Sequence, residues 1–264
     1  MGIQLRQVCL VAERLDPVVQ ELTQILGVNS CFIDPGVAQF GLENNLMVVG
    51  KNFLEVVAPI KKETAAGRFL EKRKGDGGYM VIVQIDSEDA FNQIKQNARE
   101  EGVRVAWEID IGRWKNCQFH PKDMEAAFLE IEIDEFNDFE GYWHPAGGSG
   151  WEGSVKQDST LDIIGVELQS EFPSKMATRW GRILGESPHS VKGDKEIHLN
   201  NSVLRFVQLS DGRGAGLSAV DLLVFEPGEM LKKALEKGCY VEGNAFSIGG
   251  VLWKLHTERF FDFK

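Results

Sequence analysis

The sequence predicts an α+β protein built from four β-α-β-β-β units that form two domains. Three observations support this prediction. Apolar and polar side chains alternate along many short segments, as in strands with one buried face. A helix that ends at a glycine follows the first strand of each unit. The helix ends also repeat, because Ile-Leu-Gly at 25–27 recurs at 183–185, and the segment 98–102 resembles 234–238. Repeats of this length indicate a duplicated supersecondary unit.

The first unit begins with a strand at 4–12. A helix follows, with Asp16 as the expected N-cap, Pro17 as the first helical residue and Gly27 at its end. Further strands are expected at 30–33, 39–41, 46–49 and 52–58. The second unit repeats this order, with a strand at 79–86, a helix at 87–101 and strands near 104–109, 116–119 and 127–134.

The third and fourth units form the second half of the chain. The third has a strand at 161–169 and a helix at 173–184, and the fourth runs from 218 to 256 with a helix about one turn shorter than that of the second unit. Between the halves, segment 145–159 contains a Gly-Gly-Ser-Gly run that is typical of a linker. We therefore expect domains at 1–144 and 159–264.

Composition restricts the classes of partner. A hydrophobic content of 43% and a charged content of 26% are those of a globular protein. A net charge of -11 argues against binding to nucleic acid or to an anionic membrane. The four cysteines are scattered without a Cys-x-x-Cys pair, and no secretory pattern opens the chain. Reduced thiols and a cytoplasmic location are expected.

Isolated carboxylates on two apolar strands are the most informative feature. In the strand that ends the second unit, Leu129, Ile131 and Ile133 share one face, while Glu130 and Glu132 share the other. In Phe-Leu-Glu-Val-Val-Ala-Pro at 53–59, Glu55 interrupts an otherwise apolar run. Such strands would present acids to a cavity, although an open sheet face would leave Glu130 and Glu132 in solvent.

The same segments resemble the vicinal oxygen chelate superfamily, which includes glyoxalase I, methylmalonyl-CoA epimerase, bleomycin-resistance proteins and extradiol dioxygenases. The resemblance rests on FLEVVAP at 53–59, a short helix at 64–72, GGYMVIVQID at 77–86 and FHPKDMEAAFLEI at 119–131. It implies that two units form one cup-shaped sheet. It also implies that the first and last strands of each unit each supply one metal ligand.

Carried over position by position, the resemblance assigns Gln7, Glu55 and Glu130 as metal ligands, with Glu55 and Glu130 also as catalytic groups. Met80 stands where a histidine is usual, and a thioether is a poor ligand for hard divalent ions. A divalent ion (Mg, Mn, Ni or Zn) could still bind to three oxygen donors and water. The alternative is a cup without metal, in which one of the acids takes a proton.

The second half lacks the metal ligands that the resemblance implies. The four corresponding positions hold Gly165, Arg205, a residue near Val220 and Lys254. Arg205, Lys254 and His256 would face the second cup opposite Glu167. These residues could form a site for an anionic ligand. The other interpretation is an internal ion-pair network.

The expected activity is that of a metal-dependent lyase or isomerase acting on a small hydroxy, keto or thioester compound. The alternatives are a metal-free binding protein of the bleomycin-resistance type and a scaffold. The expected partner is a small molecule, without nucleic acid or membrane, and the protein is a monomer or a homodimer. The aromatic residues Trp107, Trp114, Tyr142 and Trp143 could border the cup or the domain interface, and His120 is expected to stabilise a turn.

Overall fold

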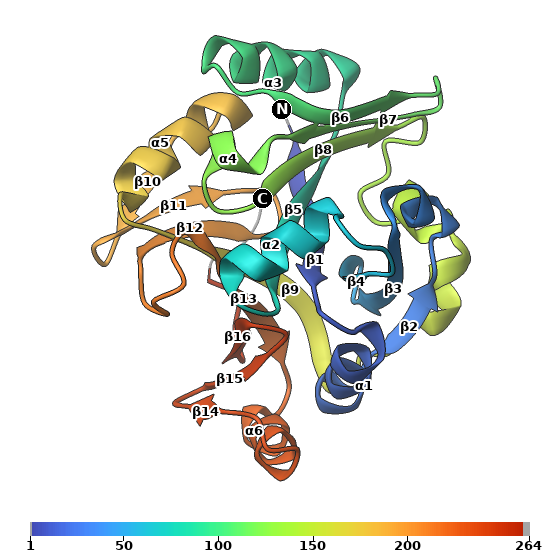
Figure 1. The fold of residues 1–264 in the computed structure, drawn as a ribbon, viewed down its shortest axis with the longest axis vertical. Coiled ribbons are helices and arrows are strands. Elements are labelled where there is room, and N and C mark those ends of the chain that lie inside the picture. The colour runs from blue at the N-terminus through green and yellow to red at the C-terminus, as the bar shows by residue number, and fades with distance from the viewer. Residues whose placement is uncertain (1, 261–264) are drawn as a thin grey trace.

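The computed structural model describes residues 2–260 and has the predicted α+β fold. Four units surround the centre of the molecule, and α2 crosses in front of them (Figure 1). The first two units consist of β1 (Ile3–Val11), α1 (Leu15–Leu26), β2 (Asn29–Phe32), the 3-10 helix η1 (Pro35–Phe40), β3 (Leu42–Val49), β4 (Asn52–Pro59), α2 (Ala65–Arg73), β5 (Gly77–Ile85), α3 (Glu88–Glu100), β6 (Val105–Asp110), β7 (Trp114–Phe119), α4 (Pro121–Met124) and β8 (Phe128–Asp134).

Two short 3-10 helices, η2 (His144–Ala146) and η3 (Gly150–Ser154), connect the halves. The last two units consist of β9 (Thr160–Ser170), α5 (Pro173–Leu184), β10 (His189–Val191), β11 (Asp194–His198), β12 (Val203–Gln208), β13 (Gly216–Val224), α6 (Pro227–Glu236), β14 (Val241–Glu242), β15 (Ala245–Ile248) and β16 (Val251–His256).

Each half of the chain forms one curved sheet. The strand order in the first is β2-β3-β4-β1-β5-β8-β7-β6, and in the second it is β10-β11-β12-β9-β13-β16-β15-β14. In both sheets the two first strands of the units pair antiparallel at the centre, and each pairs in parallel with the last strand of its own unit. The duplicated unit therefore gives each sheet an approximate twofold symmetry.

The two faces of the first sheet follow the predicted alternation. Apolar side chains such as Val8, Leu54 and Val81 pack under the helices in a core that continues into the second half. The opposite face lines the concavity that we call the first cup. Its apolar members include Phe53, Met80 and Ile82. Strand parity therefore decides which of these side chains enter the cup.

The two sheets meet where β5 approaches β13. Gly78 pairs with Leu217. A Cβ atom at Gly78 would lie 2.3 Å from Leu217 Cδ2 and 2.7 Å from the Leu217 carbonyl oxygen, so only glycine fits. Beside this contact, Arg73 Nη1 donates to the carbonyl of Arg213 at 3.0 Å, and Arg213 Nε donates to the carbonyl of Arg73 at 3.0 Å.

Two local predictions were wrong. The strand expected at 39–41 is absent, because 35–40 forms η1, which begins at an Asp-Pro-Gly turn where Asp34 Oδ1 accepts from the Gly36 N–H at 2.8 Å. The N-cap of α1 is Arg14 rather than Asp16. Pro17 still lies in the first turn, where its missing N–H costs no helical hydrogen bond.

The connecting segment is folded against the first half of the chain. We call residues 135–159 the closing segment. Trp143, Ala146 and Trp151 of this segment are buried in the apolar cluster of the first cup. It therefore adds a wall to the first cup instead of only joining two domains.

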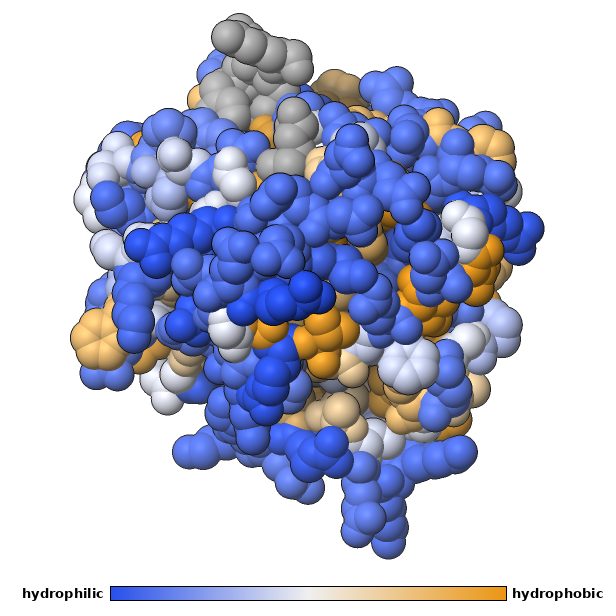
Figure 2. Space-filling view, turned by 90° about the horizontal axis from the view of Figure 1, so that it is seen from above, coloured by the Kyte–Doolittle hydropathy of each residue, from blue (hydrophilic) through white to orange (hydrophobic). Residues whose placement is uncertain are grey.

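The described residues show a largely polar face and no disulfide bond. The face seen from above is mostly hydrophilic, with apolar side chains in small separate patches (Figure 2). All four cysteines are free thiols, as expected. Among residues 2–260, no helix is both long and apolar enough to cross a membrane.

Candidate functional site

The first cup carries the predicted site residues on one face, where Gln7 contacts Glu55. Gln7, Glu55, Met80 and Glu130 are all buried on the cup face. Glu55 is paired with Cys9 across β4 and β1, and Glu130 is paired with Ile82 across β8 and β5. These two carboxyl groups therefore occupy matching positions in the two units, one on each side of the central strand pair.

Glu55 is held by two amide groups. Gln7 Nε2 donates to Glu55 Oε2 at 2.9 Å, and Asn44 Nδ2 donates to Glu55 Oε1 at 2.7 Å. The other end of the Gln7 amide is also engaged, because Trp143 Nε1 donates to Gln7 Oε1 at 2.8 Å. Burial raises the pKa of Glu55, and the hydrogen bond from Asn44 opposes that rise.

Glu130 and Glu132 form a carboxyl pair on the other side of the cup. Their exposed fractions are 4% and 1%, so the open, solvated face considered from the sequence is wrong for both. Burial raises the pKa of Glu132 well above its ordinary value, and the hydrogen bond to Glu130 raises it further. Burial also raises the pKa of Glu130, opposed by hydrogen bonds from Glu132, Gln118 and Asn116. The hydrogen bond between the two carboxyl groups therefore favours the protonated form of Glu132 and the ionised form of Glu130.

Three of these partners were missed in the sequence. Asn44 lies two residues from Leu42 and two from Leu46 along β3, and that spacing could have placed it on the same face as these apolar residues. Trp114, whose Nε1 donates to Glu132 Oε2 at 2.9 Å, was noted only as part of an aromatic cluster. Asn116, whose Nδ2 donates to Glu130 Oε1 at 3.3 Å, gave no recognisable pattern.

Aromatic side chains close the first cup. Trp143 and Trp151 have exposed fractions of 1% and 3%, and both rings pack on Phe53, with centroid distances of 6.3 and 5.3 Å. At the rim, Phe40 on η1 and Trp107 on β6 meet edge to face at 5.1 Å, joining the two units across the opening. Of the two uses considered for the aromatic cluster, the structure supports the border of the cup.

His120 has the expected structural role. It is the N-cap of α4, and its Nδ1 accepts from the Lys122 N–H at 3.2 Å. It lies at the turn before β8.

The donor atoms of the first cup do not fit a resident divalent ion in this arrangement. Gln7 Oε1 and both oxygens of Glu55 already accept hydrogen bonds. Met80 contributes only a thioether. Across the described chain, no three His, Cys, Asp or Glu side chains lie close enough together to hold a metal ion.

The second cup contains an ion-pair network. Arg205 donates to Glu167 at 2.8 Å, to Glu196 at 3.1 Å and to Asp221 at 3.2 Å. Lys254 Nζ donates to Glu167 Oε1 at 2.6 Å, and His256 Nε2 lies 2.8 Å from Asp221 Oδ1. Burial disfavours the charge on Arg205, but Asp221 and Glu167 more than compensate and raise its pKa. Each predicted cation thus has a carboxylate partner, which favours the internal network over an anion site.

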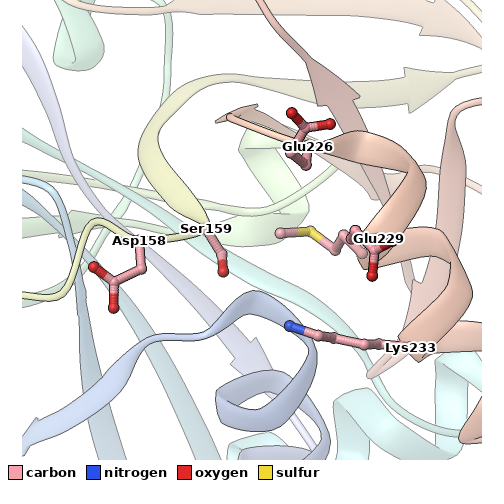
Figure 3. Close-up of a pocket in the computed structure, with 6 residues that line it drawn as sticks. Asp158, Ser159, Glu226, Glu229 and Lys233 are labelled. Carbon is pink, nitrogen blue, oxygen red and sulfur yellow. The ribbon is translucent and has the colours of Figure 1, made fainter.

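Among residues 2–260, cavities also lie outside the cups, and two of them differ in size. One of about 40 Å³ lies between the end of the closing segment and α6, and its lining includes Asp158, Ser159, Glu226, Glu229 and Lys233 (Figure 3). It has room for only a few water molecules. The other is an open groove of about 450 Å³ between the two halves, lined by Lys72, Lys122, Glu125, Phe172 and Leu209, among others.

Similar proteins are found by structure and not by sequence. The sequence matches no protein-family model, and no curated protein is detectably similar to it. The Mn(II)-bound glyoxalase from Novosphingobium aromaticivorans is similar over 96% of this chain and 81% of its own, with a TM-score of 0.65 and 12% identity. A hypothetical protein from Staphylococcus aureus is similar over 97% of this chain and 99% of its own, with a TM-score of 0.63 and 12% identity. These likenesses establish the fold: the chain is a tandem protein with the vicinal oxygen chelate fold, as predicted.

Proposed function

We propose that the first cup transfers a proton on a small oxygenated compound, as a lyase or an isomerase does, with Glu55 and Glu130 as the catalytic groups. The observation that carries this proposal is the burial of three carboxyl groups, those of Glu55, Glu130 and Glu132, in one apolar cup. Burial raises the pKa of each, which brings them toward the neutral range where a carboxyl group is an efficient acid or base.

The two sides of the cup support different roles. The hydrogen bond from Glu132 opposes the rise in the pKa of Glu130, and in its ionised form Glu130 would take a proton from a carbon next to a carbonyl group. The electron pair of the broken C–H bond then moves to the carbonyl oxygen. Glu55, which accepts hydrogen bonds from Gln7 and Asn44 on the opposite side, would in its protonated form give its proton to the carbon, and the electron pair would return from the carbonyl oxygen to form the new C–H bond. No step requires a metal, in keeping with the poor fit of the donor atoms.

A second candidate is a metal-free protein that binds a small molecule without changing it. The closed aromatic border of the cup favours this candidate, because Trp143 and Trp151 provide the flat apolar surfaces that retain an organic ligand. A cytoplasmic location and the choice between monomer and homodimer stay predictions.

The two candidates differ in an exchange experiment. Wild-type protein is incubated in D₂O with keto acids, hydroxy acids and acyl thioesters, and loss of the proton next to the carbonyl is followed by ¹H NMR. We expect exchange for at least one compound, reduced about 10²-fold or more in Glu55→Gln and in Glu130→Gln. The exposed Glu13 supplies the matched control, Glu13→Gln, which should exchange at the wild-type rate. Binding without any exchange would favour the second candidate, and exchange that persists in both cup variants would refute the assigned roles.

A further inference from the structure

Arg6 is a buried cation in the first cup that has no ion-pair partner within residues 2–260. The pairing of β1 with β5 shifts between Leu5 and Gln7, so Arg6 is the extra residue of a β-bulge. The bulge turns Arg6 toward the same side as Gln7. Its side chain is 0% exposed.

An aromatic cage surrounds the guanidinium group. Its central carbon lies 5.6 Å from the ring centres of Phe53 and Trp143, and 5.8 Å from that of Trp151. Nη2 donates to the Gly141 carbonyl at 2.8 Å. Within the described chain, Arg6 Nε and Nη1 and the indole Nε1 of Trp151 find no hydrogen-bond acceptor.

Three unpaired donors in one buried cage are unusual, because buried polar groups nearly always have partners. Burial lowers the pKa of Arg6 to about 10, so the group remains charged at neutral pH. Asp138 and Asp134 act on it only at longer range. The second cup gives a direct contrast, because Arg205 there is paired with three carboxylates.

We propose that Arg6 and the indole N–H of Trp151 bind the carboxylate of the ligand of the first cup, which makes that ligand a small hydroxy or keto acid. A carboxylate supplies both the negative charge and the acceptors that these donors lack. The cage neighbour Phe53 lies two residues from Glu55 on the same face of β4, a separation of about 7 Å. An acid bound at Arg6 therefore extends toward Glu55. The position of the reacting end of the ligand, near Glu55, rests on the proposed function. The binding of its carboxylate by Arg6 and Trp151 does not.

Entry of the ligand requires the closing segment to move. Trp143 and Trp151 cover the cage and are almost fully buried. The segment turns at Gly147 and Gly148, whose φ values of 73° and 104° lie in the region that favours glycine. The chain therefore has a turn between the two tryptophans about which the cover can rearrange.

The test follows the indole N–H signal of Trp151 by ¹H–¹⁵N NMR, with the signal identified by its absence in Trp151→Phe. Lactate and pyruvate are added at constant ionic strength, and uncharged lactamide serves as the matched control. We expect a saturable shift of the Trp151 signal with both acids and none with lactamide. The shift should be lost in Arg6→Met and kept in Glu13→Gln, whose change lies at an exposed residue outside the cup.

Two results would overturn the proposal. The first is a Trp151 signal that neither acid moves. The second is a shift that persists in Arg6→Met, provided that the dispersed spectrum shows this variant to be folded. The outcome for the proposed function is separate, because an Arg6-dependent shift without proton exchange on any compound would retain the carboxylate site and refute the catalytic roles.

Discussion

Replacing Glu132 by glutamine should make the protein more stable at neutral pH, and increasingly so as the pH rises. Glu132 is 1% exposed, accepts from Trp114 Nε1 and shares a hydrogen bond with Glu130. A protonated carboxyl group offers one donor and one acceptor. A glutamine amide offers both in nearly the same volume, so Glu132→Gln keeps these contacts and removes only the titration.

The sign and size of the effect follow from the raised pKa of Glu132. The unfolded chain releases this proton near pH 4.3, whereas the folded chain keeps it to a higher pH because burial and Glu130 raise the pKa. Between those two pH values the folded state binds more protons. The free energy of unfolding of the wild type therefore falls by up to about 1.4 kcal/mol per pH unit as the pH rises through this window. The free energy of unfolding of Glu132→Gln does not fall in this way, because the glutamine amide does not titrate.

Urea unfolding followed by tryptophan fluorescence measures the effect at several values between about pH 5 and pH 8. The difference between Glu132→Gln and the wild type should be small at the acidic end and grow toward the alkaline end. The exposed control Glu13→Gln should run parallel to the wild type. A difference that does not depend on pH, or a variant less stable at every pH, would refute the reasoning that Glu132 carries a proton in the folded cup.

Three further substitutions test the packing around the cups by the same unfolding assay. Trp143→Phe keeps a ring against Phe53 but leaves Gln7 Oε1 buried without its donor, so a loss of about 1–3 kcal/mol is expected; an unchanged stability would mean that the indole hydrogen bond is unimportant. Gly78→Ala places a Cβ 2.3 Å from Leu217 Cδ2 and should cost about 1–3 kcal/mol, whereas the unobstructed Gly228→Ala should not. Arg205→Met leaves three carboxylates of the second cup without their shared cation and should cost about 3–5 kcal/mol, and a neutral effect would contradict the ion-pair network.

The face of most strand residues could be predicted from the sequence, because side chains in a strand alternate wherever no β-bulge intervenes. This rule places Glu55 and Glu130 in one cup although they are far apart in the chain. It also correctly puts Val81 on the opposite face from Met80. The repeat then relates the two carboxyl groups by the symmetry of the first sheet.

The partners of those carboxyl groups could not be predicted in the same way. Trp143 donates to Gln7 across 136 positions of the chain, through a segment whose glycine-rich sequence indicates only a linker. Its position depends on packing against Phe53, which alternation and repeats do not report. The burial of Glu132 likewise depends on whether the sheet face is covered. Trp114 and the closing segment provide this cover.

The location of the ligand is the most direct test of the central claim that the first cup is the functional site. Backbone ¹H–¹⁵N signals of the whole chain are compared before and after pyruvate is added, with lactamide as the control. We expect saturable shifts that concentrate in β1, β4, β5, β8 and the closing segment. Shifts that concentrate instead in β9, β12, β13 and β16 would place the ligand in the second cup and contradict the claim.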